Sequence, residues 1–169
     1  ILKKVNNSKL ILKSSLNVNT DFILDKFKKF GVHNSIEFFE KDQDVENHIK
    51  SYKKIDIALD TFPYNGGITT FEALWSGVPV IGMSGFNMMS RCGESILKNA
   101  KLENLISINK EDYIDKALYL SENLKALEEL RLKIFKNILN TPLFESKIFS
   151  IDFQNKLLDI YKKTNHKII

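Results

Sequence analysis

The segment Ile55-Asp-Ile-Ala-Leu-Asp-Thr-Phe-Pro-Tyr-Asn-Gly-Gly-Ile-Thr-Thr-Phe-Glu-Ala-Leu-Trp75 places an apolar strand, a glycine-containing loop and a helix in direct succession. Ile55–Leu59 has the short apolar character of a buried strand. Asn65-Gly66-Gly67 is a turn sequence, and a helical pattern follows from Ile68 to Ser76, where Gly77 ends it. A strand that leads through a tight loop into a helix is the repeating unit of a parallel sheet. The segment therefore predicts an α/β fold.

The same alternation continues on both sides of this segment. We expect further strands at Lys9–Lys13, Ile36–Phe39, Val78–Ile81 and Leu105–Ser107, and helices at Asp21–Phe30, Asp42–Lys54 and Met89–Ala100. Strands separated by helices of this length favour right-handed crossovers. The prediction is a doubly wound parallel sheet of the Rossmann-like kind.

The domain organisation follows from where the strand pattern stops. Residues 1–109 are predicted to form the Rossmann-like domain, and residues 110–169 to form helices that pack on it, at Glu111–Ser121, Leu124–Leu139 and Glu145–Lys163. The residues before Lys9 resemble the last turns of a helix with no strand ahead of it. We therefore expect that a first strand is missing and that the chain, which starts at Ile1 and shows no secretory leader, is a piece of a longer protein.

Composition limits the possible classes of protein. Apolar residues make up 43% and charged residues 27%, and no apolar run approaches the roughly 18 residues of a membrane span. The net charge is +4, but the lysines alternate with acidic residues and form no dense stripe, so nucleic acid is not expected as a partner. Cys92 is the only cysteine, which rules out an internal disulfide and favours a cytoplasmic location.

Phosphate chemistry is indicated at the start of the helix at Ile68. Ligands bind beyond the carboxyl ends of parallel strands, and a helix start there offers unpaired backbone N–H groups and a positive dipole end. Gly66 and Gly67 carry no side chain that would keep a phosphate away, and Thr69 and Thr70 could add hydroxyl donors. The loop that begins at Asn65 is therefore predicted to bind a diphosphate.

Three further residues could belong to this site. Glu72, on the first turn, could accept hydrogen bonds from a ribose diol or could simply stabilise the helix start. Arg91 could balance phosphate charge, or it could be solvated or salt-bridged. His48, taken alone, has the features of an ordinary surface histidine, and the residues reveal no general acid–base pair, so no catalytic residue is assigned.

The sequence from Asp56 to Val80, followed by Ser90-Arg-Cys-Gly-Glu-Ser95, resembles the C-terminal catalytic half of O-GlcNAc transferases and of the related SPINDLY-type O-fucosyltransferases. In that family two Rossmann-like domains face each other in a GT-B arrangement. The C-terminal domain binds the nucleotide sugar, and tetratricopeptide repeats ahead of the two domains present the acceptor. The resemblance extends through Glu111-Asp-Tyr113 and residues 150–161.

The resemblance implies a role for individual residues. Gly66, Gly67, Ile68 and Thr69 would cradle the diphosphate, Glu72 would hold the ribose, and His48 would lie against the base. Ile68 departs from the pattern, because many relatives carry a threonine there. The donor-site lysine that the family carries ahead of the position of Ile1 is absent.

The resemblance also implies an activity: transfer of N-acetylglucosamine from UDP-GlcNAc to Ser or Thr hydroxyls of acceptor proteins, without a metal ion or other cofactor. Its partners would be the nucleotide sugar, the acceptor protein, the missing N-terminal catalytic domain and the repeats. The isolated chain would be inactive. The alternatives are a GDP-fucose-dependent O-fucosyltransferase, an Asn-glucosylating relative and a non-catalytic nucleotide-sugar-binding module.

Overall fold

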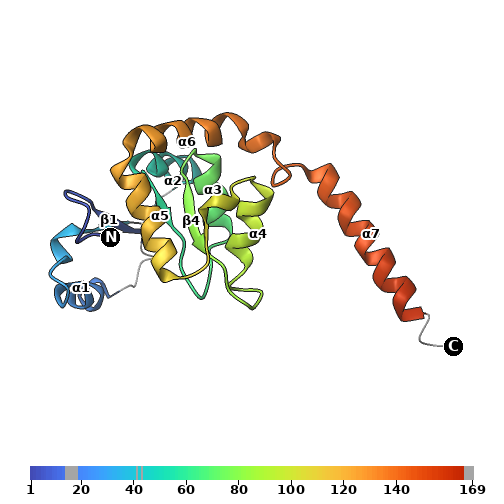
Figure 1. The fold of residues 1–169 in the computed structure, drawn as a ribbon, viewed down its shortest axis with the longest axis horizontal. Helices are drawn as coiled ribbons and strands as arrows, with labels where there is room; N and C mark the ends of the chain where they lie inside the picture. Colours follow the sequence, from blue (N-terminus) through green and yellow to red (C-terminus); the bar gives the residue numbers. More distant parts are fainter. Residues whose placement is uncertain (14–18, 41, 43, 166–169) are drawn as a thin grey trace.

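The structure, a computed structural model, describes residues 1–13, 19–40, 42 and 44–165. It contains parallel strands alternating with helices, which confirms the predicted α/β class (Figure 1). The strands are β1 (Leu10–Lys13), β2 (Ile36–Phe39), β3 (Ala58–Leu59), β4 (Val80–Met83) and β5 (Ile106–Ser107). The α-helices are α1 (Thr20–Lys28), α2 (Val45–Ser51), α3 (Ile68–Trp75), α4 (Cys92–Asn99), α5 (Lys110–Glu122), α6 (Leu124–Asn137) and α7 (Ser146–Asn165).

The strands form two groups rather than one continuous ladder. β1 pairs in parallel with β2, so that Leu10 lies opposite Ile36. β4 lies between β3 and β5 and pairs in parallel with both. No pairing joins β1 to β3 among the described strands. The alternation of strands and helices predicts the number and direction of the strands, but it carries no information on which strands are neighbours.

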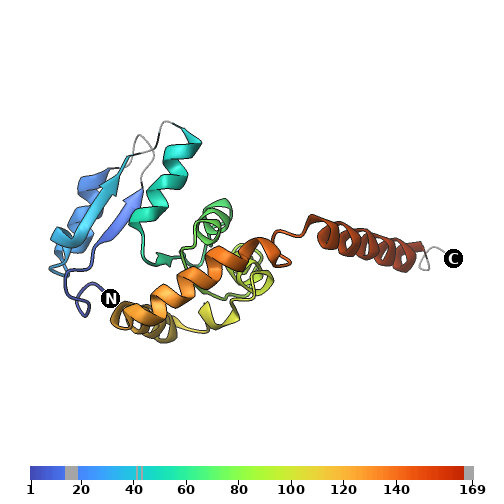
Figure 2. The ribbon, with the colours of Figure 1, turned by 90° about the horizontal axis from the view of Figure 1, so that it is seen from above.

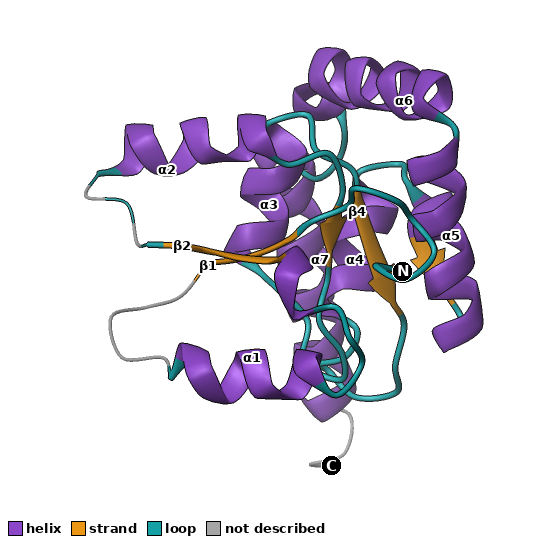
Figure 3. Ribbon diagram, turned by 90° about the vertical axis from the view of Figure 1, so that its left-hand side faces the viewer, coloured by secondary structure: helices purple, strands orange, loops and turns teal. Residues whose placement is uncertain are grey.

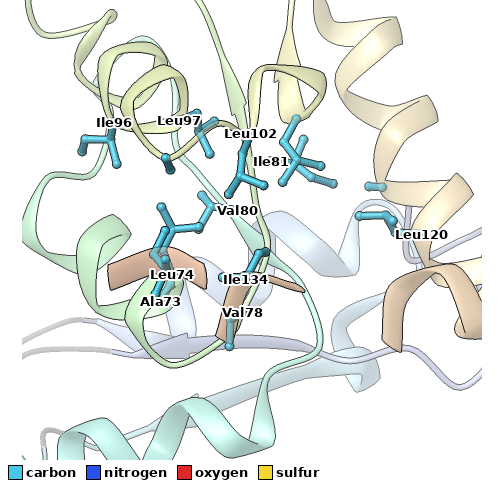
Figure 4. Packing of buried hydrophobic residues seen from close by; sticks show 14 of the residues in the cluster. Ala73, Leu74, Val78, Val80, Ile81, Ile96, Leu97, Leu102, Leu120 and Ile134 are labelled. Carbon is cyan, nitrogen blue, oxygen red and sulfur yellow. The ribbon is translucent and has the colours of Figure 1, made fainter. Parts of the chain in front are cut away.

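The hydrophobic core surrounds β4. Figure 4 shows its side chains packed between the helices on both sides, with Leu74, Val78, Ile81 and Leu97 completely buried. α3, α4 and α5 all contact β4 (Figure 3). Burying a leucine or isoleucine contributes roughly 1.5–3 kcal/mol, so this cluster is the main source of stability for the half of the domain that carries the glycine loop.

Helix boundaries follow local capping. Asn19 accepts a hydrogen bond from the Phe22 N–H at the start of α1, and Gly31, with φ of +70°, follows the end of that helix. α2 is shorter than predicted: Asp44 caps it, and its last turn continues as a 3₁₀ turn over Tyr52–Lys54. Gln43, within the predicted range, lies outside the described residues.

The last helix differs from the expectation for residues 110–169. α5 and α6 contact each other and α6 contacts α3, whereas α7 extends away from the domain (Figures 1 and 2). Every α7 residue from Ser146 to Thr164 is exposed. Among the described residues, the helix predicted at Glu145–Lys163 therefore shows no burial against the domain. Apolar periodicity identifies a helix face that suits burial, but it does not identify the surface that covers it.

Candidate functional site

The loop between β3 and α3 lies at the carboxyl ends of the central strands and is tied to the segment before α4. The Asn65 N–H donates to the Met89 carbonyl at 3.1 Å. The Asn65 side chain donates to the Thr61 carbonyl at 2.8 Å and accepts from the Gly93 N–H at 3.3 Å. Asn65 is only 4% exposed, so its amide group serves to fix the loop.

The start of α3 presents unpaired donors. Gly67 occupies the N-cap position, where no side chain caps the helix. The hydrogen bonds found within the described part of the chain do not use the N–H groups of Gly67, Ile68 or Thr69. Ile68 and Thr69 are exposed. This helix start therefore has the free N–H groups and the dipole that attract an anion.

The two loop glycines have different surroundings. A Cβ atom at Gly66 would lie 2.8 Å from the hydroxyl oxygens of both Thr69 and Thr70, and 3.1 Å from Asp60 Oδ1. A Cβ atom at Gly67 would have no atom within 4 Å. Thr70 is 4% exposed and packs beneath the loop. Gly66 is thus required for internal packing, while Gly67 leaves the outer surface of the loop open.

Glu72 forms part of a hydrogen-bonded group with two residues of the α2 region. His48 Nε2 lies 2.9 Å from Glu72 Oε2, and the Tyr52 hydroxyl donates to the same oxygen at 3.2 Å. Lys13 Nζ lies 2.6 Å from His48 Nδ1. A carboxylate can only accept, so Nε2 donates to Glu72, while Nδ1 faces both the Lys13 ammonium group and Asp42 Oδ2, which lies at 3.3 Å. Burial and the Glu72 charge raise the pKa of Tyr52, which keeps its hydroxyl a donor.

Arg91 is salt-bridged, which is one of the two alternatives that the sequence left open for this residue. Its side chain is exposed, and its Nε donates to Glu94 Oε2 at 3.2 Å. Glu94 also accepts from Lys98 Nζ at 2.5 Å and from the Ser84 hydroxyl at 2.6 Å. These partners lower the pKa of Glu94 to about 2. The group joins the end of β4 to the start of α4.

Three residues at the site were not found by sequence reasoning. Asp60 is buried under the loop and accepts from the Gly66 N–H at 2.6 Å; the only signal was an acidic residue directly after an apolar strand. Tyr52, one helical turn after His48, reaches Glu72. The Tyr113 hydroxyl donates to the Asp60 carbonyl at 2.8 Å across 53 residues, and no local pattern could have shown that contact.

A hollow at the opposite edge of the sheet serves packing. It is lined by Asp56, Gly77, Arg131 and Phe135, near the amino ends of β3 and β4. Arg131 Nη1 donates there to the carbonyls of Ile55 and Asp56, at 2.5 and 2.9 Å. The Arg131 guanidinium therefore holds backbone carbonyl groups in place. Ligands of parallel sheets bind at the other edge, beyond the carboxyl ends of the strands, so this hollow is not the candidate ligand site.

No described helix has the length and apolar character needed to cross a membrane. No group of three or more His, Cys, Asp or Glu side chains suited to a metal ion occurs in the part of the chain that the structure describes.

The domain has parallel strands, a loop with free N–H groups at their carboxyl ends, and the pair of Glu72 and His48 beside that loop. These features define a Rossmann-like domain with a candidate nucleotide site. The chain belongs to glycosyl transferase family 41, because the model of that family matches residues 1–153. The family resemblance of residues 56–80 and 90–95 is thereby confirmed.

Individual relatives agree with this family. The chain is 33% identical over 159 residues, 91% of its length, to a probable UDP-N-acetylglucosamine–peptide N-acetylglucosaminyltransferase SPINDLY of Eustoma exaltatum subsp. russellianum. It is 32% identical over 117 residues, 69% of its length, to the protein of that name in Solanum lycopersicum. It spans 17% and 13% of these relatives, respectively.

A solved structure confirms the fold. A mutant of the Thermobaculum terrenum O-GlcNAc transferase matches with a TM-score of 0.80 and 32% identity. The match covers 96% of this chain and 31% of that protein. The expected Rossmann-like fold of this glycosyltransferase family is therefore present.

Proposed function

We propose that this chain is the donor-binding part of a protein O-glycosyltransferase that transfers N-acetylglucosamine from UDP-GlcNAc to Ser or Thr hydroxyls. One observation carries the proposal: the free N–H groups of Gly67, Ile68 and Thr69 lie at the start of α3, the helix that also carries Glu72, and Glu72 is paired with His48 of α2. The relatives are named as UDP-N-acetylglucosamine–peptide N-acetylglucosaminyltransferases, which supports this donor and this type of transfer.

In the proposed complex each part of the donor has its own contact. The diphosphate accepts hydrogen bonds from the N–H groups of residues 67–69, with the Thr69 hydroxyl as a further donor. Ribose hydroxyls donate to Glu72 Oε1, because His48 and Tyr52 both bind Oε2. The base lies against the His48 ring. Asn65, Gly66 and Thr70 support this arrangement from inside the loop, and Arg91 adds positive charge at the rim.

The chemistry assigned to these residues is charge stabilisation. When the acceptor hydroxyl attacks the anomeric carbon, the bond from that carbon to the diphosphate oxygen breaks and UDP leaves with its electrons. The N–H groups and the dipole of α3 stabilise the growing negative charge. No metal ion or other cofactor is part of this proposal. The group that takes the proton from the hydroxyl is not assigned to a residue of this chain.

Calorimetric titration with UDP, GDP and ADP tests the donor site. We expect UDP to bind most tightly and Glu72→Ala to weaken UDP binding about tenfold, the effect of losing one hydrogen bond that involves a charged group. Glu129→Ala removes an exposed acid from α6 and should leave the affinity unchanged. Preference for GDP would point to a fucose donor. Equal binding of UDP by wild type and Glu72→Ala would contradict the assignment of Glu72.

The proposal extends to the organisation of the longer protein. Residues 1–109 form the donor-binding domain and residues 110–169 its C-terminal helices, with the acceptor protein held by a catalytic domain and tetratricopeptide repeats outside this chain. The protein acts in the cytoplasm, which the free Cys92 supports. The isolated chain would bind the donor but transfer no sugar, so activity assays require the longer protein.

A further inference from the structure

Asp60 is a buried carboxyl group directly beneath the glycine loop. It is 7% exposed, and its backbone N–H continues the pairing of β3 with β4 by donating to the Ile81 carbonyl at 2.9 Å. Its side-chain Oδ1 accepts from the Gly66 N–H at 2.6 Å. Its Oδ2 is buried and has no hydrogen-bond partner among the described residues.

The surroundings of Asp60 are shaped to admit this carboxyl group. A Cβ atom at Gly93, on the first turn of α4, would clash with Oδ2, and one at Gly82 would lie 3.7 Å from it. From α5, the Tyr113 hydroxyl donates to the Asp60 carbonyl at 2.8 Å. The side chain is therefore enclosed by the loop, by the start of α4 and by β4, and it has little freedom to move.

The bond to Gly66 fixes the direction of the next peptide groups. Because the Gly66 N–H points inward to Oδ1, it is withheld from any ligand. The following N–H groups, of Gly67, Ile68 and Thr69, are the ones left without partners among the residues that the structure describes. Asp60 thus separates an inward donor from the outward donors of the same loop.

We propose that Asp60 is a positioning residue for the donor diphosphate: its Oδ1 holds the Gly66 N–H inward, so that the N–H groups of residues 67–69 face the ligand. The inference rests on the proposed donor site. It concerns an acceptor atom at the Oδ1 position and not a negative charge. Burial raises the pKa of Asp60, which agrees with a role that a neutral group can fill.

Two substitutions separate the acceptor atom from the charge. Asp60→Ala removes the acceptor, and we expect UDP binding by the full-length protein to weaken about ten- to a hundredfold. Asp60→Asn keeps an oxygen that can accept from Gly66 and should bind UDP within about threefold of wild type. In turnover, KM for the donor should rise in Asp60→Ala and recover in Asp60→Asn. Asp56→Ala, an exposed aspartate before β3, is the control.

Amide hydrogen exchange at Gly66 provides a readout that needs no ligand. Exchange should be fast in Asp60→Ala and slow in both wild type and Asp60→Asn. If Asp60→Ala does not fold, the comparison of wild type with Asp60→Asn still decides the matter. A folded Asp60→Asn protein with fast Gly66 exchange or strongly weakened UDP binding would overturn the proposal, as would a folded Asp60→Ala protein that binds UDP normally. If wild type itself binds no UDP while Gly66 exchange still depends on Asp60, the proposed donor site fails and the loop contact stands.

Discussion

Substitution of Gly66 by alanine should damage the loop, whereas the same substitution at Gly67 should not. The new Cβ atom at Gly66 would lie 2.8 Å from two threonine hydroxyls, which is closer than real Cβ contacts come. Thr69 is exposed and can rotate away, but Thr70 is buried and β-branched, so its hydroxyl has little room to move. The loop must therefore shift, and the shift stretches the bond from the Gly66 N–H to Asp60.

Three contributions determine how much stability Gly66→Ala loses. Overpacking costs about 1–3 kcal/mol and the weakened hydrogen bond about 1 kcal/mol. The lower entropy of an unfolded chain with alanine offsets about 0.4–1 kcal/mol. The net loss for Gly66→Ala is about 2 kcal/mol, which for a domain of this size lowers Tm by roughly 4–8 °C. Gly67→Ala meets no atom within 4 Å and should stay within about 0.5 kcal/mol of wild type.

Urea unfolding followed by circular dichroism, with thermal melts alongside, measures both variants. UDP titration then adds a second comparison. If Gly67→Ala leaves the stability intact but weakens UDP binding, the phosphate lies next to Gly67. Equal stability of wild type and Gly66→Ala would refute the packing argument. So would equal losses in the two variants, since the structure distinguishes the two positions.

Three further predictions concern stability. The pKa of Glu94 is about 2 in the folded protein, below its ordinary 4.5, so the stability that Glu94 contributes is complete above about pH 4.5 and is lost as the pH falls toward 2. In urea unfolding, Glu94→Gln should lower the free energy of unfolding by about 1 kcal/mol at pH 7 and should reduce the loss of stability at acid pH. An unchanged acid dependence of the stability would contradict this prediction. Leu74→Ala should cost about 2–5 kcal/mol in the same assay, because Leu74 is fully buried, while Leu132→Ala on the exposed face of α6 should cost less than about 1 kcal/mol. Tyr52→Phe keeps the ring but loses the hydroxyl that donates to Glu72, so we expect a loss of about 1 kcal/mol; no loss would mean that water replaces the hydroxyl without cost.

The features that depend on short stretches of sequence could be predicted. An apolar strand, two glycines and a helical pattern that stand next to each other predict the β3–loop–α3 unit. α3 begins at Ile68 as expected and Gly77, with φ of +75°, follows its end. The helix predicted from Met89 begins only at Cys92, because Ser90 and Asn87 hydrogen-bond to each other and hold the preceding residues in a turn.

The features that depend on contacts between distant residues could not be predicted from the residues alone. The contact of His48 with Glu72 joins two helices across 24 residues, and only the family resemblance suggested that both belong to one site. Burial of Asp60 requires Gly93 of α4 beside it, because a Cβ atom there would clash with Oδ2. The exposed position of α7 depends on the absence of a covering surface among the described residues, which a helical pattern cannot encode.

The break between the two groups of strands has a consequence for motion in the protein. His48 follows β2, whereas the glycine loop follows β3, and the described strands of these groups share no ladder hydrogen bonds. Side chains such as those of Tyr52 and Glu72 connect the groups instead. A nucleotide that touches both His48 and the loop would therefore add a further link between two parts of the domain that are joined mainly by side chains. Binding of the nucleotide would therefore also stabilise β1 and β2 against local opening, and amide exchange in these strands, far from the phosphates, would become slower.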